Sequence, residues 1–220
     1  MRVERGKRLV SDEDRDRAIG LVPTLAVVAD RLEVYAELLN KWQSRINLVG
    51  RSTLHDLWTR HFADSAQLAG IVPLAGCWAD LGSGAGFPGL VLALMQDRSA
   101  SEMHLIESDA RKAAFLREVS RETGAGAVVH KARCEDILAE IDPSVIASRA
   151  MANLETLWTL SAPLVEKGAL ALFMKGRDVA SELTAASIPS SYSVTLFPSK
   201  IDAASSIVRI QSGHTVPTGD

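Results

Sequence analysis

Hydrophobic residues recur every three or four positions in the first third of the chain, between about residues 23 and 70. One such run covers Leu32, Tyr35, Leu38, Leu39, Trp42 and Ile46. A second covers Leu54, Leu57, Trp58, Phe62, Ser65 and Leu68. This spacing predicts two amphipathic helices, with Ser52 or Thr53 as the N-cap of the second. No strand pattern occurs in this region, and the charged residues 1–17 are expected to form a flexible arm.

After Pro73 the pattern changes to short apolar runs that alternate with helical segments. Strands are expected at 76–81, 103–108, 127–130, 144–150, 169–175, 192–197 and 205–211. Helices are expected up to about 95, over 109–124, over 153–164 and up to about 186. The alternation predicts an α/β fold with a doubly wound, mostly parallel, Rossmann-like sheet. The last two strands are joined directly and should be antiparallel. We therefore expect an arm and helical extension over 1–70 and an α/β domain over 71–220.

Composition argues against a membrane protein, a secreted protein and a cysteine-based metal or disulfide site. Of the 220 residues 47% are hydrophobic, yet no apolar run is long enough to cross a bilayer, and the charged N-terminus is unlike a signal peptide. Cys77 and Cys134 form no C-x-x-C pair, so neither a metal site nor a disulfide framework is expected. These features favour the cytoplasm, with no membrane contact.

The net charge of −3 gives no overall basic field for nucleic acid. One stretch is nevertheless basic, with Arg111, Lys112, Arg117, Arg121, Lys131 and Arg133. It fits either phosphate binding or a solvated helix face.

The stretch "DLGSGAGFPG" (80–89) holds the strongest chemical signal, because Gly84, Gly86 and Gly89 satisfy G-x-G-x-x-G. It follows an expected strand and opens a helix, where glycines let the backbone approach a ligand and helix amides face it. Dinucleotides and S-adenosylmethionine are both held by such loops.

Asp80 favours S-adenosylmethionine. A carboxylate near the end of a buried strand needs a partner; the sulfonium and ammonium of that cofactor would provide one, whereas a pyrophosphate would be repelled. Glu107, at the end of the next strand, is placed for ribose hydroxyls, which both cofactors carry. Neither Tyr35 nor Tyr192 begins a Tyr-x-x-x-Lys pair of the short-chain dehydrogenase kind.

Six motifs together resemble a known family. They are "KWQSRINLVG" (41–50), "RHFADSAQL" (60–68), "DLGSGAGFPGLVLAL" (80–94), "IESDARKAAFLREV" (106–119), "SRA" (148–150) and "MKG" (174–176). The chain resembles the bacterial 16S rRNA methyltransferase G family, also called glucose-inhibited division protein B. The resemblance implies methylation, dependent on S-adenosylmethionine, of N7 of a guanine in the 530 loop of 16S rRNA. It implies 16S rRNA, the 30S subunit or its precursor as partner, and we expect a monomer.

The resemblance also implies roles for individual residues. It places cofactor contacts on Gly82, Phe87, Cys134, Glu135 and Arg149. The other expected cofactor contacts are those already indicated by the glycine loop and the strand ends, namely Asp80, Gly84, Gly86 and Glu107. Expected substrate contacts, including the basic stretch, are Asn47, Arg60, His61, Asp64, Arg111, Lys112, Arg117 and Lys175. Arg149, Lys175 and His61 are the candidate catalytic residues, with Lys175 holding an RNA phosphate.

Structural explanations compete with several of these roles. Arg60 and Asp64 could form a surface ion pair, and His61 could be a satisfied structural histidine. Trp42 and Phe62 are expected in the core, and the Cys134 side chain is expected to be buried and chemically inert.

The expected acceptor constrains the chemistry. Guanine N7 carries an in-plane lone pair and needs no deprotonation, so positioning is the main requirement and His61 is at most a positioning residue. The chain carries neither an Asn/Asp-Pro-Pro-aromatic motif nor a Pro-Cys nucleophile. The alternatives are a methyltransferase for another RNA site or a small molecule, a non-catalytic cofactor-binding or nucleotide-binding module, and a dehydrogenase.

Overall fold

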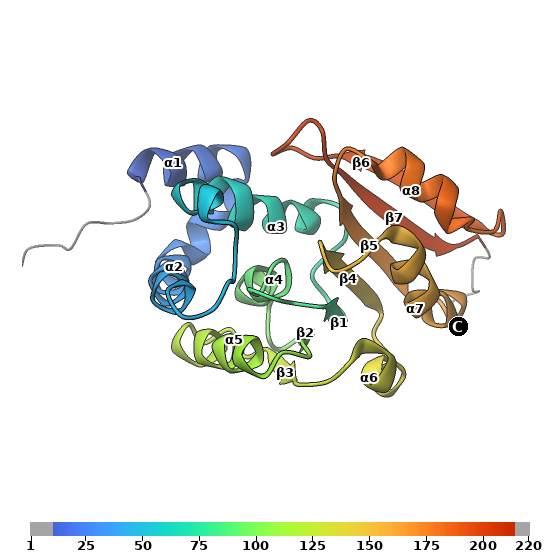
Figure 1. Cartoon of the computed structure of the whole chain (residues 1–220), viewed down its shortest axis with the longest axis horizontal. Helices are drawn as coiled ribbons and strands as arrows, with labels where there is room; N and C mark the ends of the chain where they lie inside the picture. Colours follow the sequence, from blue (N-terminus) through green and yellow to red (C-terminus); the bar gives the residue numbers. More distant parts are fainter. Residues whose placement is uncertain (1–10, 214–220) are drawn as a thin grey trace, which may run out of the picture.

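The structure is a computed structural model that describes residues 11–213, and it contains one seven-stranded sheet (Figure 1). Its strands are β1 (Gly76–Leu81), β2 (Ser101–Ile106), β3 (Val128–His130), β4 (Val145–Arg149), β5 (Leu170–Lys175), β6 (Tyr192–Pro198) and β7 (Ser206–Ser212). They lie in the order β3-β2-β1-β4-β5-β7-β6. β1 to β5 are parallel, and β7 is antiparallel to both β5 and β6. The predicted fold class and the antiparallel ending are both confirmed.

The helices of the α/β part are α4 (Gly89–Met95), α5 (Ala110–Glu122), α6 (Cys134–Ile141), α7 (Leu154–Glu166) and α8 (Val179–Ala186). α6 was not among the helices expected from the sequence. This helix has only eight residues, of which Cys134 and Leu138 are buried, so it carries few apolar positions for a helical pattern.

The N-terminal region is helical apart from the loop over 44–50, and it is more broken than predicted. It contains α1 (Asp12–Leu21), η1 (Pro23–Val28), α2 (Ala29–Gln43), η2 (Arg51–Asp56), η3 (Trp58–Ala63), α3 (Asp64–Ala66) and η4 (Gln67–Gly70). The expected second helix is thus divided into 3₁₀, π-helical and α-helical turns. Neither Ser52 nor Thr53 caps it, since η2 has no side-chain cap and the Thr53 hydroxyl donates to the Gly50 carbonyl.

The prediction of a flexible arm over 1–17 is wrong for residues 11–17; residues 1–10 lie outside the described part of the chain. Ser11 caps α1 by accepting a hydrogen bond from the Asp14 amide at 3.1 Å, and three acidic residues complement the helix dipole. The Asp14 side chain is buried and accepts the backbone amides of Trp58 and Thr59. This long-range contact, which periodicity does not report, fixes α1 against η3.

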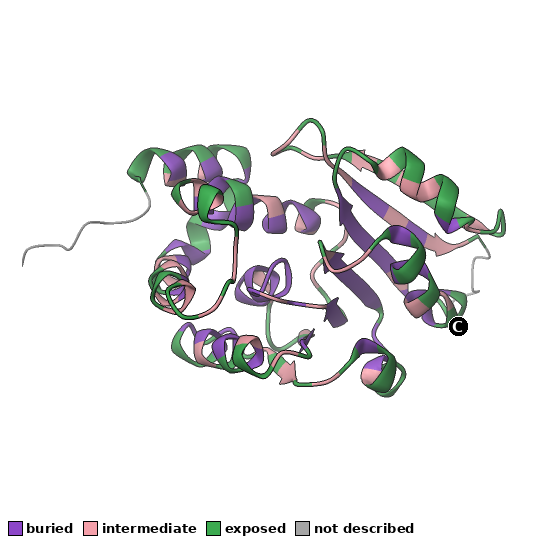
Figure 2. Cartoon of the chain, in the orientation of Figure 1, coloured by how far each residue is buried: buried purple, intermediate pink, exposed green. Residues whose placement is uncertain are grey.

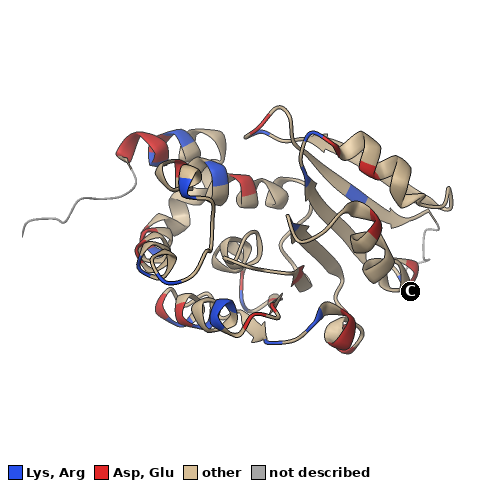
Figure 3. Ribbon diagram, in the orientation of Figure 1, with Lys and Arg blue, Asp and Glu red and all other residues tan. Residues whose placement is uncertain are grey.

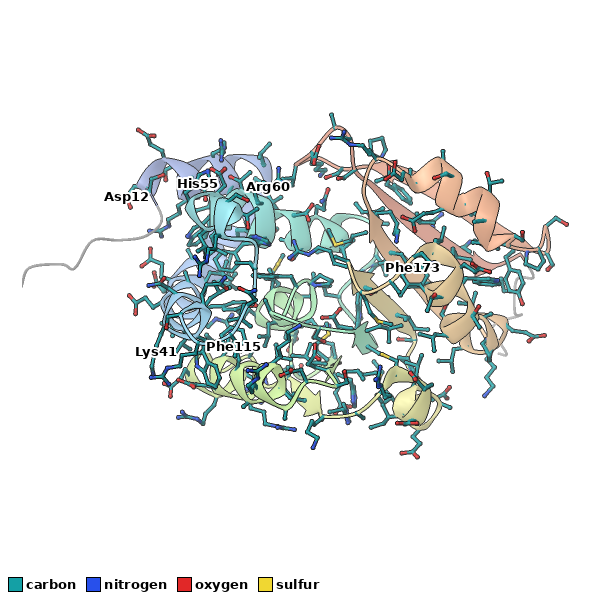
Figure 4. The ribbon with its side chains drawn as sticks, viewed as in Figure 1. Asp12, Lys41, His55, Arg60, Phe115 and Phe173 are labelled. Carbon is teal, nitrogen blue, oxygen red and sulfur yellow. The ribbon has the colours of Figure 1, made fainter. Side chains whose placement is uncertain are left out.

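Hydrophobic residues fill both faces of the sheet, whose central strands are buried (Figure 2). One cluster joins the sheet to the N-terminal helices, α4 and α5, and the other joins it to α6, α7 and α8. Phe62 is fully buried in the first cluster. Trp42 packs edge-on to Phe115, and its indole nitrogen donates to Glu118 Oε2 at 2.9 Å. Figure 4 labels Lys41 and Phe115 at this junction of α2 and α5. Both predicted core aromatics are therefore structural.

Candidate active site

The strand order reverses direction between β1 and β4. The chain passes from β1 outward to β2 and β3, then returns to form β4 on the other side of β1. In open α/β sheets, ligands bind outside the carboxyl ends of the strands at such a point. The glycine loop after Leu81 and the Arg149 side chain at the end of β4 both lie there.

The glycine loop requires glycine for two separate reasons. Gly82 and Gly86 have φ values of 62° and 91°, in the left-handed region. Added Cβ atoms would also lie 2.5 Å from Met151 Cγ and 2.5 Å from Tyr35 Oη, respectively. The Tyr35 hydroxyl donates to the Ala85 carbonyl, and its ring stacks on Phe87 with centroids 5.5 Å apart. Sequence reasoning placed Tyr35 only on an apolar helix face and missed that it holds this loop.

The two acids predicted for the cofactor lie on either side of the loop. Asp80 is completely buried; its Oδ2 accepts the Gly89 amide at 3.1 Å, and Oδ1 has no hydrogen-bond partner among the described residues. Burial raises the pKa of Asp80 to about 7. Glu107 accepts the amides of Gly84 at 2.9 Å and Asp109 at 2.7 Å, one on each oxygen. Because a carboxylate has about four acceptor sites, Glu107 retains room for hydroxyl donors.

Arg149 is the centre of a cluster that joins β4 to the N-terminal helices. Its guanidinium lies 4.8 Å above the Phe87 ring, within cation–π range, and donates to the Arg60 carbonyl and to Asp64 Oδ2, both at 3.3 Å. Burial lowers the pKa of Arg149, although the neighbouring Asp64 carboxylate acts to raise it. The ion pair of Asp64 is thus with Arg149, rather than with Arg60 as one sequence interpretation suggested.

His61 has a defined tautomer in this cluster. Its Nδ1 lies 2.8 Å from an Arg149 nitrogen, and its Nε2 lies 2.8 Å from the Thr53 hydroxyl. Because a guanidinium only donates, Nδ1 must accept and the ring proton must lie on Nε2. Burial, with Arg149 and Arg60 nearby, lowers the pKa of His61 to about 3. The imidazole is therefore neutral near pH 7, and its lone pair is already occupied.

A π-helical turn places His61 in the crevice. The turn η3 leaves Trp58 and Phe62 in the core, packed edge-on at 5.2 Å, while the His61 ring stacks on Phe87 at 4.9 Å. Such turns insert an extra residue into a helix and are frequent at functional sites. A regular helical period over this segment does not reveal the insertion.

Cys134 and Glu135 begin α6 beside the loop. Burial raises the pKa of the Cys134 thiol to about 11, although a backbone hydrogen bond from Gly82 acts in the opposite direction. The thiol is therefore protonated at neutral pH, which agrees with an inert side chain. Glu135 is exposed in the first turn of α6.

Lys175 is buried at the end of β5 rather than free to meet a phosphate. Its ammonium lies 2.6 Å from Glu182 Oε2 and donates to the Ala152 carbonyl at 2.8 Å. Glu182 Oε2 also accepts the Leu154 amide at 2.7 Å. Lys175 therefore ties β5 to α7 and α8.

The other expected substrate residues lie on the surface. Asn47 is exposed in the loop after α2, and Arg60 is exposed on η3, where Figure 4 labels it. On α5, Arg111 and Arg117 are exposed and Lys112 is partly exposed. Basic and acidic segments are mixed along α1, α2 and α5 (Figure 3).

The crevice fits S-adenosylmethionine on two observations. The buried Asp80 Oδ1 has no hydrogen-bond partner within residues 11–213, which suits a nearby cationic group. The loop is open at Gly84, where an added Cβ would meet only the Gly82 carbonyl, at 3.7 Å. Within residues 11–213 no group of three or more His, Cys, Asp and Glu side chains is arranged to hold a metal ion, and no helix is long and apolar enough to span a bilayer.

The Rossmann-like sheet with its antiparallel ending and this crevice agree with a methyltransferase that depends on S-adenosylmethionine, and the family match and relatives reported next show that class. It belongs to the rRNA small subunit methyltransferase G family, whose family model matches residues 29–204.

Relatives named ribosomal RNA small subunit methyltransferase G support this assignment. The protein from Methylobacterium nodulans is 44% identical over 206 residues, which cover 92% of this chain and 97% of the relative. The protein from Rhodospirillum centenum is 51% identical over 183 residues, or 82% of each chain. Among solved structures, the precorrin-6y C5,15-methyltransferase of Geobacter metallireducens has a TM-score of 0.54 at 10% identity, covering 76% of this chain and 91% of that one. That likeness concerns the fold alone.

Proposed function

We propose that this chain transfers a methyl group to N7 of a guanine in the 530 loop of 16S rRNA, acting as a monomer on the 30S subunit or its precursor in the cytoplasm. Membership of the methyltransferase G family supports the RNA class. When bound, S-adenosylmethionine supplies an electrophilic methyl group on a sulfonium. The lone pair of N7 forms the new bond, the bonding pair stays on sulfur, and no proton has to leave the base.

Family membership is the observation that carries the acceptor assignment, and the occupied lone pair of His61 agrees with it. An acceptor that must lose a proton needs a base within reach. At this crevice Arg149 occupies Nδ1, and the pKa of His61 is about 3. His61 is therefore unavailable as a general base, which agrees with an acceptor such as N7, for which a held and oriented guanine suffices.

Individual residues would then position the reactants. Phe87 and the glycine backbone would hold the cofactor. Arg149, which contacts both Phe87 and Asp64, would link the part of the crevice that holds the cofactor to the part that holds the guanine. Lys175 would maintain the wall of the part that holds the guanine through Glu182.

Single-turnover methyl transfer to purified 30S subunits that lack the modification would test this function. The labelled product should be cleaved by borohydride and aniline, which act on the cationic 7-methylguanine ring. The rate at saturating cofactor should be nearly flat from about pH 6.5 to 8.5, the range in which an unperturbed histidine base would titrate. Label that resists this cleavage, with a rate that rises tenfold per pH unit, would instead indicate a proton-losing acceptor. Matched subunits that already carry the methyl group are the control.

A further inference from the structure

A cavity of about 210 Å³ lies at the carboxyl ends of β4 and β5, on the side of Arg149 away from β1. Residues that line it include Asp64, Gln67, Arg149, Lys175, Glu182 and Ser206. Pockets for drug-sized ligands usually measure about 300–1,000 Å³, so this one suits a smaller group. Enzymes that modify a base commonly take a single extruded base into such a pocket.

Most polar groups in the cavity wall are already engaged. The Gln67 amide donates to the Asp64 carbonyl, to Asp64 Oδ1 at 2.8 Å and to Ser199 Oγ, and its oxygen accepts the Lys200 amide. Lys175 is held by Glu182 and by the Ala152 carbonyl. These groups shape the cavity and have little remaining capacity for a ligand.

Asp64, in contrast, keeps capacity to accept further hydrogen bonds. Each of its oxygens accepts one side-chain hydrogen bond, from Gln67 on Oδ1 and from Arg149 on Oδ2. A carboxylate has about four acceptor sites, so two remain. Its neighbours fix its orientation, and Arg149 connects it to Phe87 in the glycine loop. Although burial raises the pKa of Asp64, Arg149 acts against that shift and favours the ionised form.

A carboxylate with two spare acceptor sites matches the Watson–Crick edge of guanine, which presents N1–H and the 2-amino group as adjacent donors. Adenine presents a lone pair at N1 and would be repelled there. Holding guanine by this edge also leaves N7 free to react. We propose that Asp64 is the specificity-determining residue of this enzyme, accepting hydrogen bonds from N1–H and the 2-amino group of the extruded guanine. This inference rests on the proposed function.

The test compares 30S particles reconstituted with guanosine or with inosine at the target position. Inosine keeps N7 but lacks the 2-amino group. For the wild-type protein, kcat/KM should favour guanosine by roughly 10- to 100-fold, the range for one hydrogen bond to a charged group. In Asp64→Asn this preference should fall to within about threefold, because an amide oxygen is a weaker acceptor and the amide nitrogen only donates. Calorimetric affinity for S-adenosylmethionine should be retained.

Glu182→Gln is the matched control, because it makes the same chemical change on the other carboxylate of the cavity. It should lower both rates together and keep the wild-type preference. If Asp64→Asn transfers no methyl group, the same preference is measured from equilibrium binding of the two particles in the presence of S-adenosylhomocysteine.

Two results would overturn the role of Asp64: a wild-type protein that does not distinguish the two particles, or an Asp64→Asn protein that keeps the wild-type preference. A wild-type protein that methylates neither particle at N7 would instead refute the proposed function.

Discussion

Replacing Asp80 with asparagine removes an ionisable group that the fold buries completely at the end of β1. Burial raises the pKa of Asp80 from its ordinary value of 3.8 to about 7. Because the folded-state pKa is raised, the protonated acid is the form that the fold prefers. The stability associated with it is complete below about pH 4 and is lost as the pH rises through 7.

The size of this effect follows from the two pKa values. Their difference corresponds to about 4 kcal/mol when the group is fully ionised, of which about 3 kcal/mol falls between pH 5 and pH 8. Relative to Asp80→Asn, the free energy of unfolding of the wild-type protein should therefore decrease by about that amount over this range. Urea denaturation of both proteins at several pH values measures the difference, and groups common to both cancel.

The same group should couple to the cofactor. Asp80 lies beneath the glycine loop, so its charge would act on a bound cation through the loop rather than by open contact. Binding of S-adenosylmethionine at about pH 6.5 should then release protons, seen by calorimetry in buffers of different ionisation heat. Asp80→Asn should bind more weakly and release fewer protons. Parallel stability curves for the two proteins, with equal proton release, would refute the role given to Asp80.

Three further predictions concern other parts of the site. Gly89→Ala should destabilise the protein by roughly 1–3 kcal/mol in urea denaturation, since its Cβ would lie 2.6 Å from Asp80 Oδ2. Gly20→Ala, whose Cβ meets no described atom within 4 Å, is the control, and equal stabilities of the two variants would contradict the overlap. His61→Asn should keep a single-turnover rate within about tenfold of wild type. Because the folded-state pKa of His61 is lowered, wild-type stability should also fall by up to about 4 kcal/mol between pH 6.5 and 3, and the variant should lose less. A variant without activity, or an equal loss of stability, would count against this role. Neutralising three basic side chains of α5 should weaken RNA binding and lower its salt slope by up to roughly 2, without changing affinity for S-adenosylmethionine. Unchanged RNA affinity would place the RNA surface elsewhere. The substituted residues are Arg111, Lys112 and Arg117.

The sequence predicted the sheet well because each strand carries its own local signal. Buried apolar runs, glycine punctuation and the direct connection of the last two strands predicted the parallel sheet with its antiparallel ending. The glycine loop was found in the same way, because left-handed backbone and close packing against Met151 and Tyr35 both demand glycine.

The errors lie where structure depends on contacts between distant residues. α1 is stabilised by the Ser11 cap and by the contacts of Asp14 with η3, and its sequence is mostly charged. The π-helical turn that places His61 keeps its apolar residues near helical spacing, so periodicity alone did not reveal it. The pairing of Asp64 with Arg149 joins residues far apart in the chain, which spacing along one helix cannot predict.

Mass mapping of 16S rRNA from cells with and without this gene tests the central claim most directly. We predict one difference, a 7-methylguanosine in the 530 loop that is present only with the gene and returns with the wild-type copy. The Asp64→Asn copy should restore less of it. An unchanged 530 loop, or a lost methyl group on another atom or another RNA, would contradict the account.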